Sequence, residues 1–143
     1  MTLARIRAWE PYFRSLLRIV VGFTFSLHGA QKLFGLLGGM GGKGVKASFP
    51  SLAWFAGFLE AFGGWLILLG LLTTVTAFIL SGEMAVAYFL RHAPRGFWPL
   101  LNSGELAVVY CFVFLYLFAA GPGPWSLDAW FRKDSGAGGG VRR

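Results

Sequence analysis

Four long apolar segments divide the chain, and they constrain its fold more than any other feature of the sequence. They cover residues 15–37, 52–71, 73–90 and about 101–120. Each is close to the ~20 residues that a helix needs to cross the ~30 Å hydrocarbon layer of a bilayer. Isolated segments in lipid satisfy their backbone polar groups only as helices. The sequence therefore predicts an all-α membrane protein, a four-transmembrane-helix antiparallel bundle.

The composition leaves little room for a soluble protein of this length. Hydrophobic residues make up 56% of the 143 residues, glycine adds 21 more, and charged residues account for 13%. Soluble domains contain about 25% charged residues, and a short chain buries only part of its apolar surface. The net charge of +7 comes from Lys and Arg at segment ends rather than along one face. We therefore expect a lipid bilayer as the partner of this chain, and no nucleic acid.

The pattern divides the chain into three parts and orients it. Residues 1–14 are predicted to form a cytoplasmic interfacial segment, residues 15–130 the four-helix membrane domain, and residues 131–143 a flexible basic tail. Lys and Arg near the ends of spans favour the cytoplasmic side. Eight of these residues flank the termini, against four in the loops of the opposite side. The eight are Arg5, Arg7, Arg14, Arg18, Arg132, Lys133, Arg142 and Arg143, and the four are Lys43, Lys46, Arg91 and Arg95. We predict a multi-pass protein with both termini in the cytoplasm.

Apart from Arg18 near the start of the first segment, five His, Lys and Glu side chains lie inside the apolar segments. They are His28, Lys32, Glu60, Glu83 and Glu105. A charge at the centre of a membrane helix costs roughly 2.5–3.5 kcal/mol on insertion scales, so such residues are rare and usually paired or functional. With a rise of ~1.5 Å per residue, His28, Glu60 and Glu83 fall about 12 Å below the outer boundary. Lys32 and Glu105 lie somewhat higher, so the sequence predicts one polar pocket in the outer half of the bundle.

The residue types in this pocket indicate proton chemistry. His28 and Lys32 are four residues apart and share one face of the first helix. Three carboxyl groups in low-dielectric surroundings cannot all be ionised, so we expect at least one of them to hold a proton. A protonated carboxyl beside a histidine suits a quinone or proton-relay site. The candidate catalytic residues are Glu60, Glu83, His28 and Lys32, and the candidate cofactor-binding residues are Asn102, Glu105, Gln31 and Arg91.

Other interpretations of the polar residues stay open. Glu–Lys pairs inside a membrane can hold helices in register without binding a ligand. A metal ion held by His28, Glu60 and Glu83 is an alternative, although the paired Glu-x-x-His helices of di-iron bundles are absent. A carrier for a small solute is a further alternative, although no discontinuous helix pair is visible. His92, in the predicted loop at residues 91–101, is expected to be solvated.

Small residues recur every fourth position in all four segments. The sets are Gly22-Ser26-Ala30, Ala53-Gly57-Ala61, Ala77-Ser81-Ala85 and Ser103-Ala107-Cys111. Such spacing lets membrane helices approach closely. On the first, third and fourth segments these residues lie roughly opposite the ionisable face. We therefore expect them to contact another protomer or a partner subunit, unless they only reflect how common small residues are in membrane helices.

Five short motifs appear in order at consistent spacing. They are His28-Gly29-Ala30-Gln31-Lys32-Leu33-Phe34-Gly35, Leu59-Glu60-Ala61-Phe62-Gly63-Gly64, Gly82-Glu83-Met84-Ala85-Val86-Ala87-Tyr88-Phe89, Asn102-Ser103-Gly104-Glu105 and Gly121-Pro122-Gly123-Pro124-Trp125-Ser126-Leu127-Asp128. On these residues the chain resembles the DoxX family of four-helix membrane proteins over about residues 17–130. The family's motif positions match His28, Lys32, Glu60, Glu83, Asn102 and Glu105.

The resemblance implies a protein of the bacterial cytoplasmic (inner) membrane, linked to quinone and thiosulfate redox chemistry and to oxidative-stress defence. One branch of the family is the membrane subunit of a thiosulfate:quinone oxidoreductase. The single cysteine, Cys111, argues against self-contained thiol chemistry here. We therefore expect a redox-linked membrane component, a part of a quinone-linked oxidoreductase with quinone as the suspected cofactor. The alternative is a non-catalytic accessory subunit, as a homo-oligomer or within a larger membrane redox complex.

Overall fold

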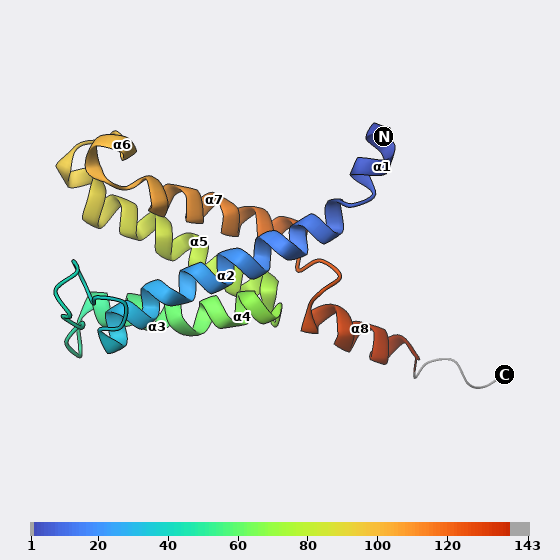
Figure 1. Cartoon of the computed structure of the whole chain (residues 1–143), viewed down its shortest axis with the longest axis horizontal. Coiled ribbons are helices and arrows are strands. Elements are labelled where there is room, and N and C mark those ends of the chain that lie inside the picture. Colours follow the sequence, from blue (N-terminus) through green and yellow to red (C-terminus); the bar gives the residue numbers. More distant parts are fainter. Residues whose placement is uncertain (1, 138–143) are drawn as a thin grey trace.

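The computed structural model of the chain describes residues 2–137, which are mostly helical, with one long connection at residues 35–51 (Figure 1). The helices in chain order are α1 (Leu3–Arg7), α2 (Glu10–Phe34), α3 (Leu52–Phe58), the π-helix η1 (Leu59–Gly63), α4 (Gly64–Leu69), α5 (Thr73–Ala87), the π-helix η2 (Tyr88–His92), the 3₁₀-helix η3 (Ala93–Arg95), α6 (Pro99–Asn102), α7 (Glu105–Ala120) and α8 (Leu127–Ala137). Within the described residues there is no strand, only an isolated bridge between Met40 and Val45. The predicted all-α class is confirmed for this part of the chain.

Two helical segments are long and apolar enough to cross a membrane. They are Leu52–Leu69, with 18 residues, and Thr73–Arg95, with 23 residues. The apolar helix α7 has 16 residues, and α2 has 25 residues but includes several charged side chains. Residues 2–137 therefore show two candidate membrane spans by length and composition.

The helix boundaries differ from the predicted segments where glycine or a left-handed residue ends a helix. α2 stops at Phe34 because Gly35 takes a left-handed conformation with φ 70°. The fourth segment is divided, since Ser103 is left-handed with φ 59° between α6 and α7. α8 continues through Ala137, into the segment expected to be a flexible tail, and residues 138–143 lie outside the described part.

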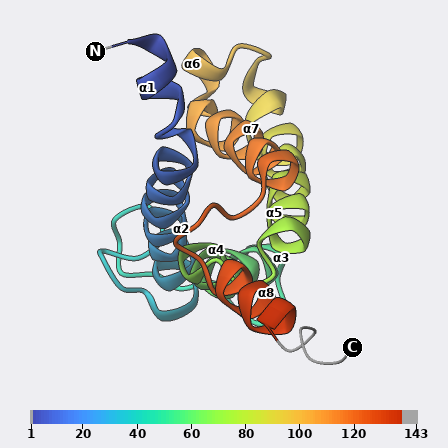
Figure 2. The ribbon, with the colours of Figure 1, turned by 90° about the vertical axis from the view of Figure 1, so that its right-hand side faces the viewer.

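The helices pack as two pairs. α2 runs along α3, η1 and α4, while α5 runs along α7, and Figure 2 shows these pairs on opposite sides of the molecule. The helices α1 and α8 lie at one end, called here the termini end, and the 38–51 loop and α6 lie at the other, called the loop end (Figure 1). The apolar core between the pairs is formed around Phe25, Ile67, Leu80, Phe114 and Leu117, all nearly inaccessible.

Small residues allow α2 to touch its neighbour at backbone distance. A Cβ atom added to Gly29 would overlap the backbone of Ala61, and one added to Gly64 would lie 2.7 Å from the backbone nitrogen of Ser26. Ser81 makes the corresponding contact in the other pair, where its Oγ donates to the carbonyl oxygen of Cys111 at 2.9 Å. The expectation that these sets face another protomer is therefore wrong for the buried members. These are Gly22, Ser26, Gly57, Ala61, Ala77, Ser81 and Ala107, which line contacts inside one chain.

We expect Gly29→Ala to lower the free energy of unfolding by roughly 1–3 kcal/mol, because the added methyl pushes α2 away from η1. Gly82→Ala is the matched control, since nothing lies within 4 Å of a Cβ at that position. Alanine there should be neutral or stabilising by up to about 1 kcal/mol through helix propensity. Unfolding in mixed detergent micelles, followed by circular dichroism, measures both. Equal stability of the two variants would contradict the close packing of α2.

A buried arginine joins the helices at the termini end. Arg18 is 0% exposed, and its guanidinium donates to carbonyl oxygens at the end of α4 and in the 121–126 segment. The acceptors are Ile67 and Leu68, both at 2.5 Å, Pro122 at 2.9 Å, and Trp125. Arg18 was expected to be a charge at the cytoplasmic interface; that interpretation is corrected, because the chain folds its last connection around this side chain.

Asp128 completes the same junction. Its carboxylate accepts hydrogen bonds from the backbone N–H groups of Leu72 at 2.8 Å and Thr73 at 2.9 Å. These N–H groups belong to the start of α5, where the first donors of a helix have no partner within the helix. Arg18, on α2, binds the carbonyl groups of Pro122 and Trp125, and Asp128 binds the start of α5. Because Arg18 also binds α4, residues 121–128 help to connect α2, α4 and α5.

Candidate functional site

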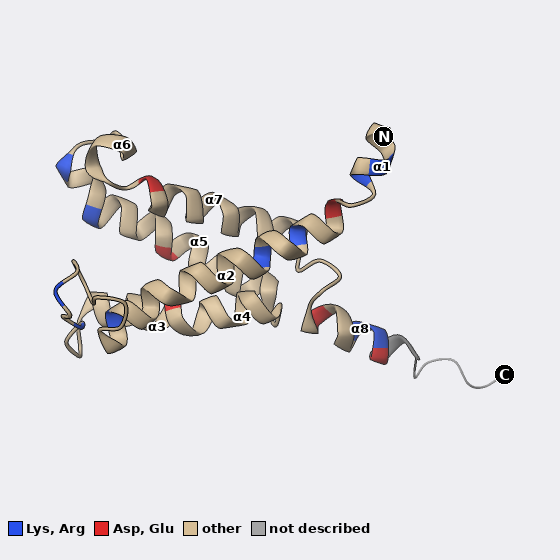
Figure 3. Cartoon of the chain, in the orientation of Figure 1, with Lys and Arg blue, Asp and Glu red and all other residues tan. Residues whose placement is uncertain are grey.

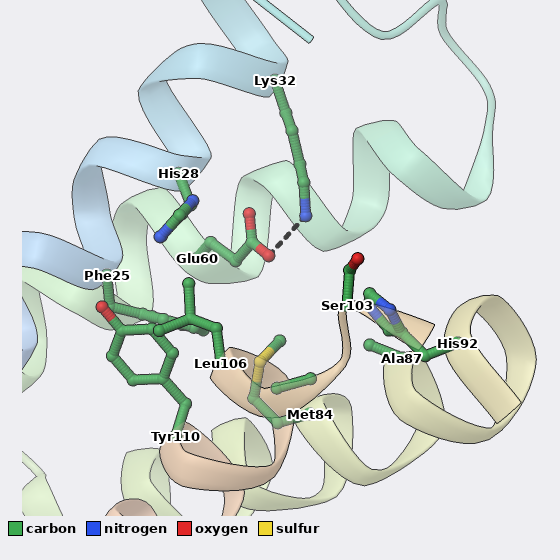
Figure 4. Close-up of a pocket in the computed structure, with 11 residues that line it drawn as sticks. Phe25, His28, Lys32, Glu60, Met84, Ala87, His92, Ser103, Leu106 and Tyr110 are labelled. Carbon is green, nitrogen blue, oxygen red and sulfur yellow. Dashed lines mark hydrogen bonds and ion pairs between the residues drawn. The ribbon is translucent and has the colours of Figure 1, made fainter. Parts of the chain in front are cut away.

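An ion pair between α2 and η1 forms the centre of the candidate site (Figure 4). Lys32 Nζ donates to Glu60 Oε1 at 2.5 Å. Glu60 is 3% exposed, and the side chain of Lys32 is 29% exposed. The second carboxyl oxygen of Glu60, Oε2, is buried and has no hydrogen-bond partner. One acceptor of the pair is therefore free to bind a ligand or a proton.

Two π-helical turns bring residues to this site. Glu60 lies in η1, which interrupts the second helix, and His92 lies in η2, which extends α5 beyond Ala87. A π turn inserts an extra residue into the helix, and such turns are frequent at functional sites. The insertion changes which side chains face inward, so a regular 3.6-residue period does not reveal them.

The first hollow adjoins the ion pair and has a volume of about 180 Å³. His28, Lys32, Glu60 and His92 supply its polar wall. The apolar wall comes from Phe25, Met84, Ala87, Leu106, Ala107 and Tyr110, and Ser103 lies at its edge (Figure 4). The ring of His28 meets that of Tyr110 edge-on, with 6.0 Å between the centroids. The hollow is thus a small chamber with charge on one side and hydrocarbon on the other.

A second hollow of about 450 Å³ shares Lys32, Ala87 and His92 with the first. Glu83 and Arg91 contribute to its polar end. Both carboxyl oxygens of Glu83 are buried without a hydrogen-bond partner. All four candidate catalytic residues and the candidate binding residue Arg91 therefore lie around two adjoining hollows.

Three other candidate binding residues lie outside both hollows. Asn102 is buried, donates from Nδ2 to the Gly96 carbonyl at 2.6 Å and accepts from the Gly104 N–H at 2.8 Å, which shapes the turn before α7. Glu105 is exposed at the start of α7. Gln31 donates to the carbonyl oxygen of Leu37 at 3.2 Å and so supports the end of α2. The sequence placed Gln31 and Glu105 in membrane segments that are helical in the structure, but Asn102 lies in the separate helix α6, and the sequence could not give the direction of the three side chains.

Sequence reasoning missed two residues of the first hollow. His92, expected to be solvated, is half-buried and lines both hollows, with its Nδ1 3.1 Å from the carbonyl oxygen of Asn102. Tyr110 is buried, and its hydroxyl donates to Thr24 Oγ1 at 2.9 Å. The helix that carries His92 continues to Arg95. Proline in the 91–101 stretch concealed this continuation, because Pro94 reads as a helix terminator.

The charge distribution agrees with an internal site. Figure 3 shows Lys and Arg mainly near the two ends of the molecule and a few charged positions within the helices. In residues 2–137, no group of three or more His, Cys, Asp or Glu side chains is placed to hold a metal ion. The alternative of a metal held by His28, Glu60 and Glu83 therefore has no support in the described part of the chain.

Residues 2–137, with apolar helices and a Lys–Glu pair whose carboxylate is buried, have the features of a membrane protein with an internal polar site. The comparison with protein families agrees with this class: the DoxX family model matches residues 13–93, and the chain belongs to the DoxX family.

Two curated relatives cover most of the chain. An uncharacterized protein of Haemophilus influenzae is 44% identical over 131 residues, covering 90% of this chain and 97% of the relative. An uncharacterized membrane protein of Mycobacterium tuberculosis is 31% identical over 136 residues, covering 85% and 82%. No solved structure matches the chain.

Proposed function

We propose that α2 and α7 also span the membrane, giving a four-helix bundle in the bacterial inner membrane with both termini in the cytoplasm. Charged side chains lower the mean hydropathy of α2, but two of them have partners within the chain. Arg18 is buried against carbonyl groups and Lys32 is paired with Glu60, which supports a membrane-spanning α2. The outer surfaces of the two helices are apolar. Their exposed side chains include Leu16, Leu17, Val20 and Phe23 on α2, and Leu106, Val109, Phe112 and Leu115 on α7.

Within this bundle, we propose that the first hollow binds the headgroup of a quinone in a redox-linked membrane component. The observation that carries the proposal is the Lys32–Glu60 pair, whose carboxylate is buried beside a small chamber and has one oxygen without a partner. The chamber, at about 180 Å³, is smaller than the roughly 300–1,000 Å³ of pockets for drug-sized ligands. It therefore suits a single ring rather than a larger molecule.

The side chains match the chemistry of a quinone ring. When bound, a quinone supplies two carbonyl oxygens that accept hydrogen bonds and, on reduction, protons. Lys32 would donate a hydrogen bond to one carbonyl, and a charge-assisted bond of this kind contributes about 1.5–3 kcal/mol. Glu60, with an acceptor oxygen that has no partner, would hold or release a proton next to the ring, and Glu83 would exchange protons from the adjoining second hollow. His28 and Tyr110 would hold the ring against the α2 side of the chamber.

A binding experiment tests the proposal. The purified protein is titrated with a tail-free 2,3-dimethoxy-5-methyl-1,4-benzoquinone, and bound ring is measured by equilibrium dialysis. The double variant Lys32→Gln with Glu60→Gln keeps a hydrogen-bonding pair but removes both charges. We expect its affinity to fall by about tenfold or more, the equivalent of one charge-assisted hydrogen bond.

Glu105→Gln is the matched control, because Glu105 is exposed and lies outside both hollows. Its affinity should equal that of the original chain. If the ring does not bind, or if it binds equally well to the double variant, the quinone site is refuted. Co-purification of a larger redox complex that stays active with Glu60→Gln would then favour the accessory-subunit alternative.

A further inference from the structure

The second hollow adjoins the ion pair at Lys32 and is lined mainly by apolar side chains. Its long walls are apolar: Leu52, Phe55 and Leu59 come from α3 and η1, and Ile79, Val86 and Leu90 come from α5 and η2. The polar residues Lys32, Glu83, Arg91 and His92 complete its lining. An apolar groove that adjoins a polar chamber matches an amphiphilic ligand with its polar part inside.

The two walls come from helices that diverge. α5 packs against η1 and α4, and in Figure 1 it separates from α3 toward the loop end. Phe55, on α3, is 52% exposed and Val86, on α5, is 52% exposed, so the groove between them is open along the surface of the chain. In a membrane this opening faces acyl chains, which gives an apolar ligand direct entry from the bilayer.

The two hollows adjoin at three residues. Lys32, Ala87 and His92 border both, so the two hollows lie next to each other along these side chains. The second hollow, at about 450 Å³, is more than twice the volume of the first, at about 180 Å³. The larger, mainly apolar second hollow therefore lies beside the small first hollow with its polar wall. This arrangement matches a ligand that has a polar headgroup and an apolar tail.

We propose that the second hollow binds the alkyl or isoprenoid tail of the ligand, so that the site selects a lipid-linked quinone and admits it sideways between α3 and α5. This inference rests on the proposed function of the first hollow. It adds that the ligand enters from the lipid phase. It also adds that the site prefers a quinone with a tail, since a water-soluble ring without a tail leaves the larger hollow unused.

The test compares the tail-free ring with the same ring carrying a decyl chain. Burial of even two methylene groups corresponds to roughly a tenfold gain in affinity, so the decyl compound should bind at least about ten times more tightly. Ile79→Trp places a large side chain in the second hollow without touching the first. It should reduce the gain from the tail to about twofold or less while leaving the affinity of the tail-free ring unchanged.

Leu115→Trp is the control for partition of the decyl compound into the micelle. Leu115 is exposed on α7 and lines neither hollow. This variant should retain the full gain from the tail. A gain that survives in Ile79→Trp, or a decyl compound that binds no better than the tail-free ring, overturns the tail site while the ring site stands. Absence of binding by the tail-free ring instead refutes the proposed function itself.

Discussion

Replacement of Arg18 by methionine is expected to prevent recovery of folded protein. Methionine fills much of the volume but removes the hydrogen bonds to the carbonyl groups of Ile67, Leu68, Pro122 and Trp125. A buried carbonyl that loses its partner costs about 1–3 kcal/mol. The carbonyl of Ile67 keeps the N–H of Gly70 at 3.0 Å, so the loss comes from the other three carbonyl groups and should be about 3 kcal/mol or more in total. That is a large part of the roughly 5–15 kcal/mol that holds a typical domain together. Size-exclusion chromatography and unfolding in mixed micelles measure the effect.

Two further variants separate the hydrogen bonds of Arg18 from its charge. Arg18→Lys keeps the charge, but an ammonium group at one point cannot reach acceptors on both α4 and the 121–126 segment, so this variant should be intermediate. Arg7→Met removes an exposed arginine from α1 and should change stability by less than about 0.5 kcal/mol. If Arg18→Met unfolds like Arg7→Met, Arg18 does not hold the helices together at the termini end.

Replacement of Lys32 by methionine should produce the second-largest effect. It leaves the carboxylate of Glu60 buried with neither oxygen paired. Removal of one member of a fully buried ion pair costs about 3–5 kcal/mol. Because the side chain of Lys32 is 29% exposed, we expect a loss of roughly 2–4 kcal/mol in the free energy of unfolding. The same micelle titration measures it.

The matching double variant distinguishes a structural pair from a functional one. Lys32→Met together with Glu60→Leu replaces both charges with apolar groups, and such replacements are often neutral in stability. We expect it to recover most of the stability lost in Lys32→Met while failing to bind the tail-free quinone. A double variant that is stable and binds the quinone normally would leave the pair with a purely structural role. Failure to recover stability would show that Glu60 has a further partner.

The sequence located much of the candidate site through one physical fact: charge in a membrane helix is costly. Helical rise places His28, Glu60 and Glu83 at one depth and Lys32 somewhat higher, and the structure brings these four residues to adjoining hollows. Depth depends only on position along a helix. The direction in which a side chain points from its helix depends also on helix boundaries and π turns, so the sequence did not show that Glu105 is exposed.

The residues Gly22 and Ser26 illustrate a different limit. Their spacing predicts that a helix can approach another closely, but it does not say which one, and the partner is α4 of the same chain. Likewise, Arg18 is one of several arginines near the start of a predicted span. From the sequence alone it is counted among the Lys and Arg residues that predict cytoplasmic termini. Its burial depends on the 121–126 segment, more than one hundred residues away, which provides two of its acceptors.

The amino-acid sequence by itself determined the helical class, the approximate segments and the polar residues, because hydropathy and helical rise are local properties. The family followed from short motifs in a fixed order. Only the tertiary structure decided that Lys32 binds Glu60, that His92 turns inward and that Arg18 is buried. These outcomes depend on which helices pack together and on where π turns change the side chains that face inward. Such contacts form between segments far apart in the chain, so the local sequence of either segment does not predict them.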